Sequence, residues 1–278
     1  MILLGTNAYA AQGENGRRQA AALATWRGLA ELRPVNLQWA DDVYEVEGFA
    51  TEPSLRLDSR VVSGRQGPRK PIVREMLDRM AERAEREGAR WFGYANSDVQ
   101  LTPAVVERME REGRQAYAFA RMELDGATGA EGGMLLSGTD AFFFTPTWWR
   151  ANRQRFRAYI AGEPIWDNVF TAITLCHSDG LLLDREPLVR HESHPAGDWT
   201  RSPFAPYLRW LSALDAPYFS LWAAYFWHVT LFRAAGASAQ EEAELRARTF
   251  RFAPTAGQRV VHAGRVVKAH LRYRVGGR

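Results

Sequence analysis

The strongest constraint on the fold is the regular alternation of short apolar stretches with amphipathic segments through about residue 190. Apolar stretches at residues 2–4, 35–39, 90–95, 116–122 and 141–145 are typical of buried strands. Between them, residues 17–32, 71–87 and 102–112 carry apolar side chains at helical spacing, with Pro34 expected to end the first helix and Pro71 to open the second. This alternation predicts an α/β fold, a sheet flanked by helices.

Other segments complete this prediction. We expect helices at residues 147–159 and 167–176, an extended segment at 181–189, and irregular structure at 48–70 and 126–133. Beyond residue 202 the pattern changes. Residues 203–250 are helical by pattern and rich in aromatic side chains, whereas residues 257–278 are basic and lightly patterned. We therefore predict a catalytic domain over residues 1–202, an aromatic-rich helical extension over 203–256 and a basic tail, partly without regular structure, over 257–278.

Composition narrows the class of protein. A hydrophobic fraction of 46% and a charged fraction of 24% are those of an ordinary globular protein. The net charge of +4 suits a nucleotide diphosphate or an anionic membrane surface, but no basic run argues for nucleic acid. Cys176 is the single cysteine, which excludes an intrachain disulfide and a cysteine-based zinc site.

Residues 218–232 are too short to span a bilayer, and the first residues lack the pattern of a signal peptide. We expect a cytoplasmic protein and leave peripheral membrane contact open.

The first candidate site is Asn96-Ser97-Asp98, which directly follows an apolar strand. Open α/β sheets bind ligands at the carboxyl ends of their strands. An aspartate in this position can hold a hard cation, Mg²⁺ or Mn²⁺, that bridges two phosphates. The alternative is that Asp98 only stabilises a turn.

Three further segments carry reactive or charged side chains. Asp167 opens a predicted helix, where a carboxylate can serve as a general base or simply cap the helix. His191 and His194 fall within four residues of a loop, as metal or phosphate ligands or as surface residues. Arg69 and Lys70 precede a helix and form either an anion site or a solvated pair.

The order of these segments resembles a known family. The chain reads FGYANSDV, then GTDAFFF, GEPIWDN and HESH, after a first strand that ends in Thr6-Asn7. Residues 1–200 thereby resemble the GT-A glycosyltransferases, a Rossmann-like nucleotide-diphospho-sugar transferase fold with a mixed sheet, and in particular bacterial and plant proteins with NSD and WDN blocks. One position departs from the family pattern, because Asn96 stands where the metal-binding triplet usually begins with aspartate.

The resemblance implies roles for individual residues. Asp98, with His191 or His194, would bind the divalent metal, Mn²⁺ or Mg²⁺, and Asp167 would deprotonate the acceptor. The donor would contact the following residues: Thr6, Asn7, Asp42, Arg69, Lys70, Asn96 and Ser97. We further place Trp166, Trp199 and Trp222 as candidates for contact with the acceptor.

The implied function is a metal-dependent, inverting glycosyltransferase of the hexosyltransferase type. It would move a sugar from a nucleotide-diphosphate donor to the hydroxyl of a glycan, lipid or small molecule. Two alternatives stay open. One is a nucleotidyltransferase, for which Gly13 to Arg18 are a faint signature. The other is a binding module without catalysis, which Asn96 in the metal triplet would fit.

Overall fold

A computed structural model describes residues 1–177, 179–194, 199–251 and 256–275, with the side chains of residues 199, 256, 274 and 275 left out. Its strands are β1 (Ile2–Thr6), β2 (Leu32–Trp39), β3 (Ala50–Leu55), β4 (Trp91–Ala95), β5 (Val99–Leu101), β6 (Ala116–Leu124), β7 (Glu131–Phe144), β8 (Gly180–Leu183) and β9 (Val189–Glu192). Its helices are α1 (Gly13–Arg27), α2 (Ser59–Ser63), α3 (Val73–Glu87), α4 (Ala104–Glu112), α5 (Pro146–Asn152), η1 (Arg153–Arg155), α6 (Trp166–Cys176), η2 (Trp199–Arg201), α7 (Ala205–Leu214), α8 (Ala216–Ala234), α9 (Ala239–Thr249) and α10 (Ala256–Val275).

All strands join one mixed sheet in the order β3-β2-β1-β4-β7-β6-β9-β5, with β8 also paired to β6. Strands β1 to β4 run parallel, β7 runs antiparallel to both β4 and β6, and β9 runs parallel to β6. The strand direction reverses from β4 to β7 and again from β7 to β6. Strand β9 therefore runs in the same direction as β1 and β4 and ends at the same edge of the sheet. The α/β fold class expected from the sequence, a mixed sheet flanked by helices, is confirmed.

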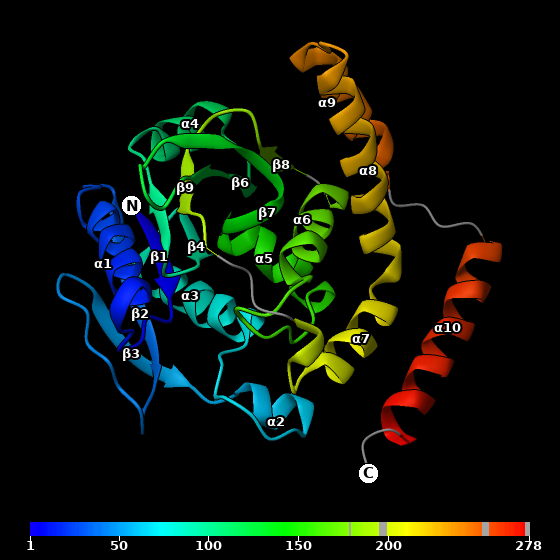
Figure 1. Cartoon of the computed structure of the whole chain (residues 1–278), viewed down its shortest axis with the longest axis horizontal. Coiled ribbons are helices and arrows are strands. Elements are labelled where there is room, and N and C mark those ends of the chain that lie inside the picture. The colour runs from blue at the N-terminus through cyan, green and yellow to red at the C-terminus, as the bar shows by residue number, and fades with distance from the viewer. Residues whose placement is uncertain (178, 195–198, 252–255, 276–278) are drawn as a thin grey trace.

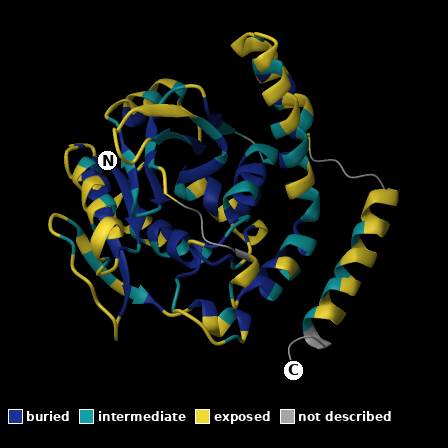
Figure 2. Cartoon of the chain, in the orientation of Figure 1, coloured by how far each residue is buried: buried dark blue, intermediate teal, exposed yellow. Residues whose placement is uncertain are grey.

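Helices cover both faces of the sheet (Figure 1). Successive side chains of a strand point to opposite faces, so Phe142 and Phe144 pack with α3, α5 and α6, whereas Phe143 packs with α1 and α4. Figure 2 shows the sheet and the inner faces of these helices as the buried part of the molecule. Gly93 allows close contact between β4 and β7, because a Cβ there would lie 2.3 Å from the carbonyl oxygen of Phe142.

Several boundaries differ from the sequence-based expectation. Helix α1 ends at Arg27, and Pro34 lies inside β2, paired with Leu4 of β1, where its missing N–H is tolerated. Residues 50–55 form strand β3, and the helix expected at 147–159 ends at Asn152. Pro71 precedes α3, which begins at Val73. Packing against the sheet decided these positions, which local periodicity does not resolve.

The C-terminal helices lie on one side of the α/β unit (Figure 1). Residues 257–275 form part of helix α10, in place of the lightly structured tail expected there. Tyr273 of α10 stacks on Trp210 of α7 at 5.1 Å between ring centroids, and its hydroxyl donates a 2.5 Å hydrogen bond to the carbonyl oxygen of Ser63. Among the described residues, no helix combines the length and apolarity needed to cross a lipid bilayer.

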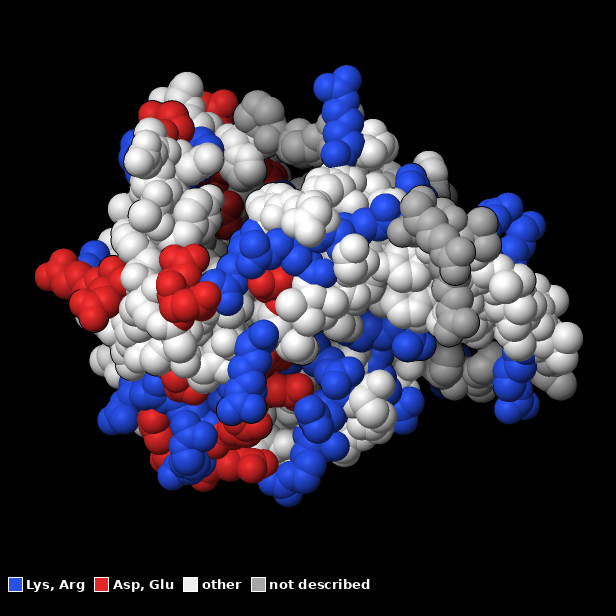
Figure 3. Space-filling model, turned by 90° about the horizontal axis from the view of Figure 1, so that it is seen from below, with Lys and Arg blue, Asp and Glu red and all other residues white. Residues whose placement is uncertain are grey.

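Charge is distributed unevenly along the chain. The sequence after Glu244 contains nine of the 36 basic residues and none of the 32 acidic ones. Figure 3 views the molecule from below, and toward its right-hand end, where α10 lies, basic and uncharged side chains are seen without acidic ones. The formal charge of +4 is therefore carried by the C-terminal segment, while the preceding residues are net acidic.

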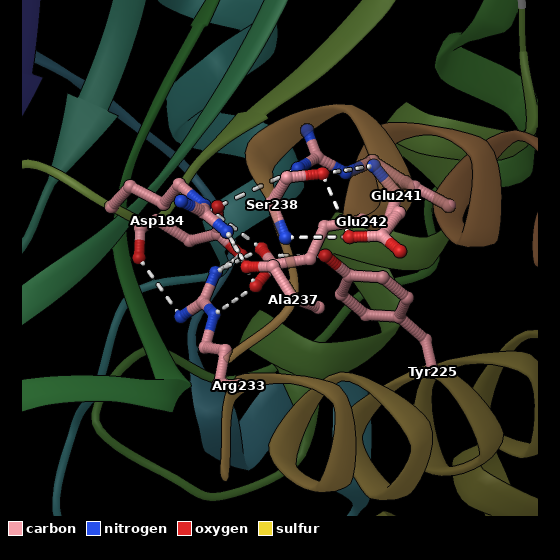
Figure 4. Close-up of polar contacts among 9 residues, drawn as sticks. Asp184, Tyr225, Arg233, Ala237, Ser238, Glu241 and Glu242 are labelled. Atoms are coloured by element: carbon pink, nitrogen blue, oxygen red, sulfur yellow. Dashed lines mark hydrogen bonds and ion pairs between the residues drawn. The ribbon is translucent and has the colours of Figure 1, made fainter. Parts of the chain in front are cut away.

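A buried ion-pair network joins α8 and α9 to the sheet (Figure 4). Arg233 of α8 contacts both Glu242 of α9 and Asp184, which follows β8, each at 2.9 Å. Arg185 adds a second contact to Glu242 at 2.8 Å. Glu242 and Asp184 are almost fully buried, and loss of Arg233 would take one of the two arginine partners from each of these desolvated carboxylates. This network fixes the helical extension on the α/β unit.

Candidate metal and nucleotide site

Strand register brings Asp98 and His191 together. Asp98 immediately precedes β5, whose Val99 pairs with His191 of β9, and β9 also places His191 opposite Glu123 of β6. The Oδ2 atom of Asp98 lies 3.5 Å from Nε2 of His191 and 3.6 Å from Nε2 of His194. The three candidate ligand atoms all lie within 4.8 Å of one another. Three residues from two separate motifs, NSD and HESH, thus lie together at the carboxyl edge of the sheet.

These positions fit a divalent transition metal. Ligand atoms bound at about 2.0–2.2 Å to one ion, at angles of 90–120°, are separated by about 2.8–3.8 Å. The two distances from Asp98 fall in this range. The donors are one carboxylate and two imidazoles, and imidazole suits transition metals better than it suits Mg²⁺.

Glu123 holds the ring of His191. Its Oε2 atom lies 3.3 Å from Nδ1 of His191 and also accepts a hydrogen bond from the hydroxyl of Ser193. Burial favours the neutral form of the His191 imidazole. Hydrogen bonds to Asp98 and Glu123 outweigh this effect and raise the pKa of His191 to about 9. Burial likewise opposes ionisation of Glu123, yet hydrogen bonds from His191 and Ser193 and contact with Arg121 lower its pKa to about 2. A carboxylate behind a ligating histidine orients the ring and increases its basicity.

Asn96 has a supporting position. Its Nδ2 atom donates to Oδ1 of Asp140 at 2.9 Å, and its Oδ1 accepts from the hydroxyl of Tyr94 at 2.8 Å. Asp140 is 4% exposed and also contacts Arg121. An aspartate at position 96 would place a second carboxylate at this distance from Asp140. Asparagine in the first position of the triplet avoids this repulsion and donates a hydrogen bond instead. Ser97, the middle residue of the triplet, is half-buried.

Asp167 lies in the first turn of α6, two residues after Ile165, which adopts a φ of 85°. Ile165 occupies the N-cap position, so Asp167 is not the capping residue. Burial and the nearby charge of Asp140 raise the pKa of Asp167 to about 7. Its side chain is still partly exposed. A carboxylate with this pKa changes protonation state near neutral pH, as a general base must.

The predicted donor residues surround the ends of β1 and β2. Thr6 is 1% exposed, and its Oγ1 has no hydrogen-bond partner among the described residues. Asn7 donates to the carbonyl oxygen of Leu37 at 2.6 Å. Asn36 and Gln38, which the sequence patterns did not single out, bind the backbone of Ala8 through side-chain amides at 2.9 and 2.8 Å. These amides shape the end of β1 where a ligand would lie.

The predicted phosphate contacts are already ion-paired. Lys70 lies 2.7 Å from Glu163, and Arg69 lies 2.9 Å from Asp41 and stacks over the ring of Trp39. Asp42 is exposed in the turn after β2. The structure thus places Arg69 and Lys70 next to carboxylates that a bound diphosphate would have to displace or share.

The three tryptophans predicted for the acceptor differ in position. Trp166 packs in the core against Tyr94 at 5.7 Å between ring centroids, and Trp222 packs against Tyr225 at 5.9 Å. Both are 3% exposed, which favours a packing role. Trp199 begins η2, and its side chain lies outside the described part of the structure.

Sequence reasoning missed Arg121, Glu123 and Asp140. Arg121 and Glu123 are on β6, and Asp140 is in β7. The only signal was an aspartate inside the apolar stretch GTDAFFF, where a buried charge requires a partner.

No family model and no curated protein sequence matches the chain. Several solved structures do match, among them a galactosyltransferase and a mannosyltransferase. S. aureus TarS 1-349 in complex with UDP-GlcNAc is 10% identical with a TM-score of 0.49, over 77% of this chain and 66% of that chain. Mannosyltransferase PcManGT from Pyrobaculum calidifontis, in complex with GDP-Man and Mn²⁺, is 11% identical with a TM-score of 0.39, over 98% and 86%.

The galactosyltransferase LgtC, in complex with donor and acceptor sugar analogs, is 12% identical with a TM-score of 0.35, over 74% of this chain and 91% of that chain. The chain covers 66% of TarS 1-349 in the alignment with the UDP-GlcNAc complex and 91% in the alignment with a second structure of TarS 1-349. At 10–12% identity and TM-scores below 0.5, these likenesses carry no argument about this chain. The chain's own residues have to support any statement about its activity.

Proposed function

We propose that the protein is a metal-dependent glycosyltransferase that moves a sugar from a nucleotide-diphosphate donor to a hydroxyl acceptor. The observation that supports this most is the convergence of Asp98, His191 and His194 at the carboxyl edge of the sheet. This edge is where open α/β sheets bind nucleotides. UDP-GlcNAc in the TarS structure and GDP-Man in the PcManGT structure suggest the donor class to test.

Asp98, His191 and His194 would hold the cation, and Glu123 would orient His191. The bound metal would supply charge neutralisation for the leaving nucleoside diphosphate. Lys70 lies 2.7 Å from Glu163 and can exchange that contact for a phosphate oxygen. Two of the three ligands are imidazoles, which suit transition metals better than Mg²⁺, so Mn²⁺ and Mg²⁺ are tested side by side.

Asp167 would be the general base. It would take the proton of the acceptor hydroxyl as the acceptor oxygen bonds to the anomeric carbon and the bond to the diphosphate oxygen breaks. Its raised pKa, caused by burial and by Asp140, makes it a stronger base than an ordinary aspartate. One carboxylate acting directly on the acceptor fits a single displacement with inversion.

The test is calorimetric titration of UDP and GDP in the presence of Mn²⁺, Mg²⁺ or a chelator. Wild type should bind one nucleotide in a Mn²⁺-dependent manner, and Asp98→Ala should lose about 10-fold or more of that affinity, as expected for loss of a metal ligand. Glu110→Ala is the matched control, because Glu110 is an exposed carboxylate on α4. Equal metal-dependent affinity in Asp98→Ala and in the control would remove Asp98 from the site.

Sugar release from UDP-GlcNAc and GDP-Man then separates the proposal from its alternatives. A glycosyltransferase should slowly hydrolyse one donor to free sugar and nucleoside diphosphate. A nucleotidyltransferase would instead release pyrophosphate from a nucleoside triphosphate and a sugar phosphate. Metal-dependent binding of nucleotide with neither reaction would indicate a binding module.

A further inference from the structure

A large cleft lies outside the candidate site, between the C-terminal helices and the rest of the chain. Its walls come from the segment after α5, the junction of α7 and α8, and the first half of α10, which are far apart in the sequence (Figure 1). The cleft has a volume of about 980 Å³. This is large enough for a small-molecule ligand rather than for a single ion.

The lining of the cleft is strongly cationic. It contains one histidine and five arginines, which are Arg155, Arg157, Arg251, Arg259 and Arg265, against one carboxylate, Asp215. Asp215 is 2% exposed and already bound by Arg157 at 2.7 Å and by the hydroxyl of Tyr159 at 3.1 Å. Within the described ranges, Arg251, Arg259 and Arg265 form no ion pair with a carboxylate. Their charges remain available to a ligand.

The junction of α7 and α8 also borders the cleft. Ala216, Pro217 and Tyr218 form the first turn of α8, and α7 ends at Leu214, so the negative end of α7 offsets the positive end of α8 and the arginines supply the positive potential. Apolar side chains share the cleft with these groups: Leu214, Pro217, Leu221 and Val261. The lining therefore combines anion-binding groups with an apolar wall.

The described residues that line this cleft do not include Asp98, His191 or His194, the candidate metal ligands. Tyr218 at its border lies 3.1 Å from His177, which directly follows the C-terminal end of α6. Asp167 lies in the first turn of the same helix. Ten residues of helix separate the two positions by about 15 Å at 1.5 Å per residue.

We propose that the cleft is a second ligand site, which binds a phosphate-bearing amphiphile. The phosphate contacts Arg259 and Arg265 near the first turn of α8, and the apolar part lies against Leu221 and Val261. Arginine suits this role because its guanidinium group binds phosphate oxygens in pairs. The ligand is either a lipid with a phosphate headgroup or a soluble phosphorylated compound, and both share this chemistry.

The test compares two double variants of α10. Arg259→Ala/Arg265→Ala removes two cleft arginines, and Lys268→Ala/Arg272→Ala removes two exposed charges of the same helix that do not line the cleft. Binding of inorganic pyrophosphate and of dihexanoyl phosphatidic acid, below its micellar concentration, is measured by calorimetry with the full chain. Chelator is present throughout, so that metal-dependent binding at Asp98 does not contribute.

Wild type should bind dihexanoyl phosphatidic acid more tightly than pyrophosphate. Each charged contact to phosphate is worth about tenfold in affinity, so the cleft variant should lose about 100-fold and the control variant little. Sedimentation with phosphatidylcholine vesicles, with and without phosphatidic acid, distinguishes the sources. Vesicle binding lost only in the cleft variant identifies a lipid headgroup, and vesicle binding equal in all proteins identifies a soluble ligand.

Two results would overturn the proposal. The first is no measurable binding of either probe to wild type, or equal affinity in wild type and the cleft variant. The second is an equal loss of affinity in the two variants, which would show that the probes bind through the overall positive charge of α10 and not through the cleft. Melting temperatures of both variants serve as a folding control, and exposed arginines on α10 should leave them unchanged. Because chelator removes the metal site from the measurement, failure here is distinct from failure of the proposed glycosyl transfer.

Discussion

Replacing Asp167 by asparagine separates a catalytic from a structural role of this carboxylate. Burial and the charge of Asp140 raise its pKa from 3.8 to about 7. A difference of about 3 units corresponds to about 4 kcal/mol, which is the cost of keeping the carboxylate charged in the folded protein. Because the side chain is partly exposed, solvent screening reduces this cost, and we expect about 2 kcal/mol.

The sign follows from the two pKa values. Below pH 3.8 the carboxyl group is protonated in the folded and the unfolded chain, so it makes no difference. Between pH 3.8 and about 7 the unfolded chain has lost the proton that the folded protein retains, so the contribution of Asp167 to stability falls as pH rises. Above pH about 7 the penalty is complete. Asparagine removes it, and Asp167→Asn should be more stable than wild type by about 2 kcal/mol at pH 8 and about equal to it at pH ~3.

Urea unfolding of wild type and Asp167→Asn across this pH range measures the difference. In the same preparations, metal-dependent nucleotide binding should be unchanged, whereas turnover should fall by about 10²–10⁴-fold. Turnover of wild type should rise with pH around the pKa of about 7. A stabilised variant with full activity would leave Asp167 as a buried charge without a catalytic role. Identical pH dependence of stability in both proteins would refute the electrostatic reasoning itself.

Three other substitutions test the site and the helical extension. Asn96→Asp restores the usual triplet but places a carboxylate opposite Asp140. It should therefore destabilise the protein by about 2 kcal/mol and weaken metal-dependent nucleotide binding. Tighter nucleotide binding would contradict this reasoning. Trp222→Ala truncates a core side chain and should lower the free energy of unfolding in urea by about 3–5 kcal/mol. Trp227 is 67% exposed, so Trp227→Ala should leave the free energy of unfolding unchanged and reduce any binding to liposomes. A loss of stability at Trp227 as large as at Trp222 would contradict a surface position for Trp227.

Local patterns in the sequence were sufficient for the elements that have strong periodicity or clear termini. Helix α3 has Met76, Leu77 and Met80 on one face and ends at Gly88, whose φ of 66° favours glycine, so both its face and its end could be predicted. Strand β4 could be predicted from its continuous apolar run. Strand β3 could not, because its sequence ATEPSL is mostly polar and contains a proline, and it is extended through pairing with β2 at the edge of the sheet.

The candidate site shows the same division. The types of residue in the NSD and HESH motifs indicated cation ligands, but Asp98 and His191 are far apart in the chain, and only the pairing of β9 with β5 brings their side chains within 3.5 Å. Likewise, Glu123 reaches His191 through the register of β6 and β9, and the amide of Asn96 meets Asp140 across β4 and β7. The sequence determined which donors and acceptors the chain contains. Strand register decided which of them meet, because hydrogen-bonding between distant strands depends on long-range packing that no local pattern encodes.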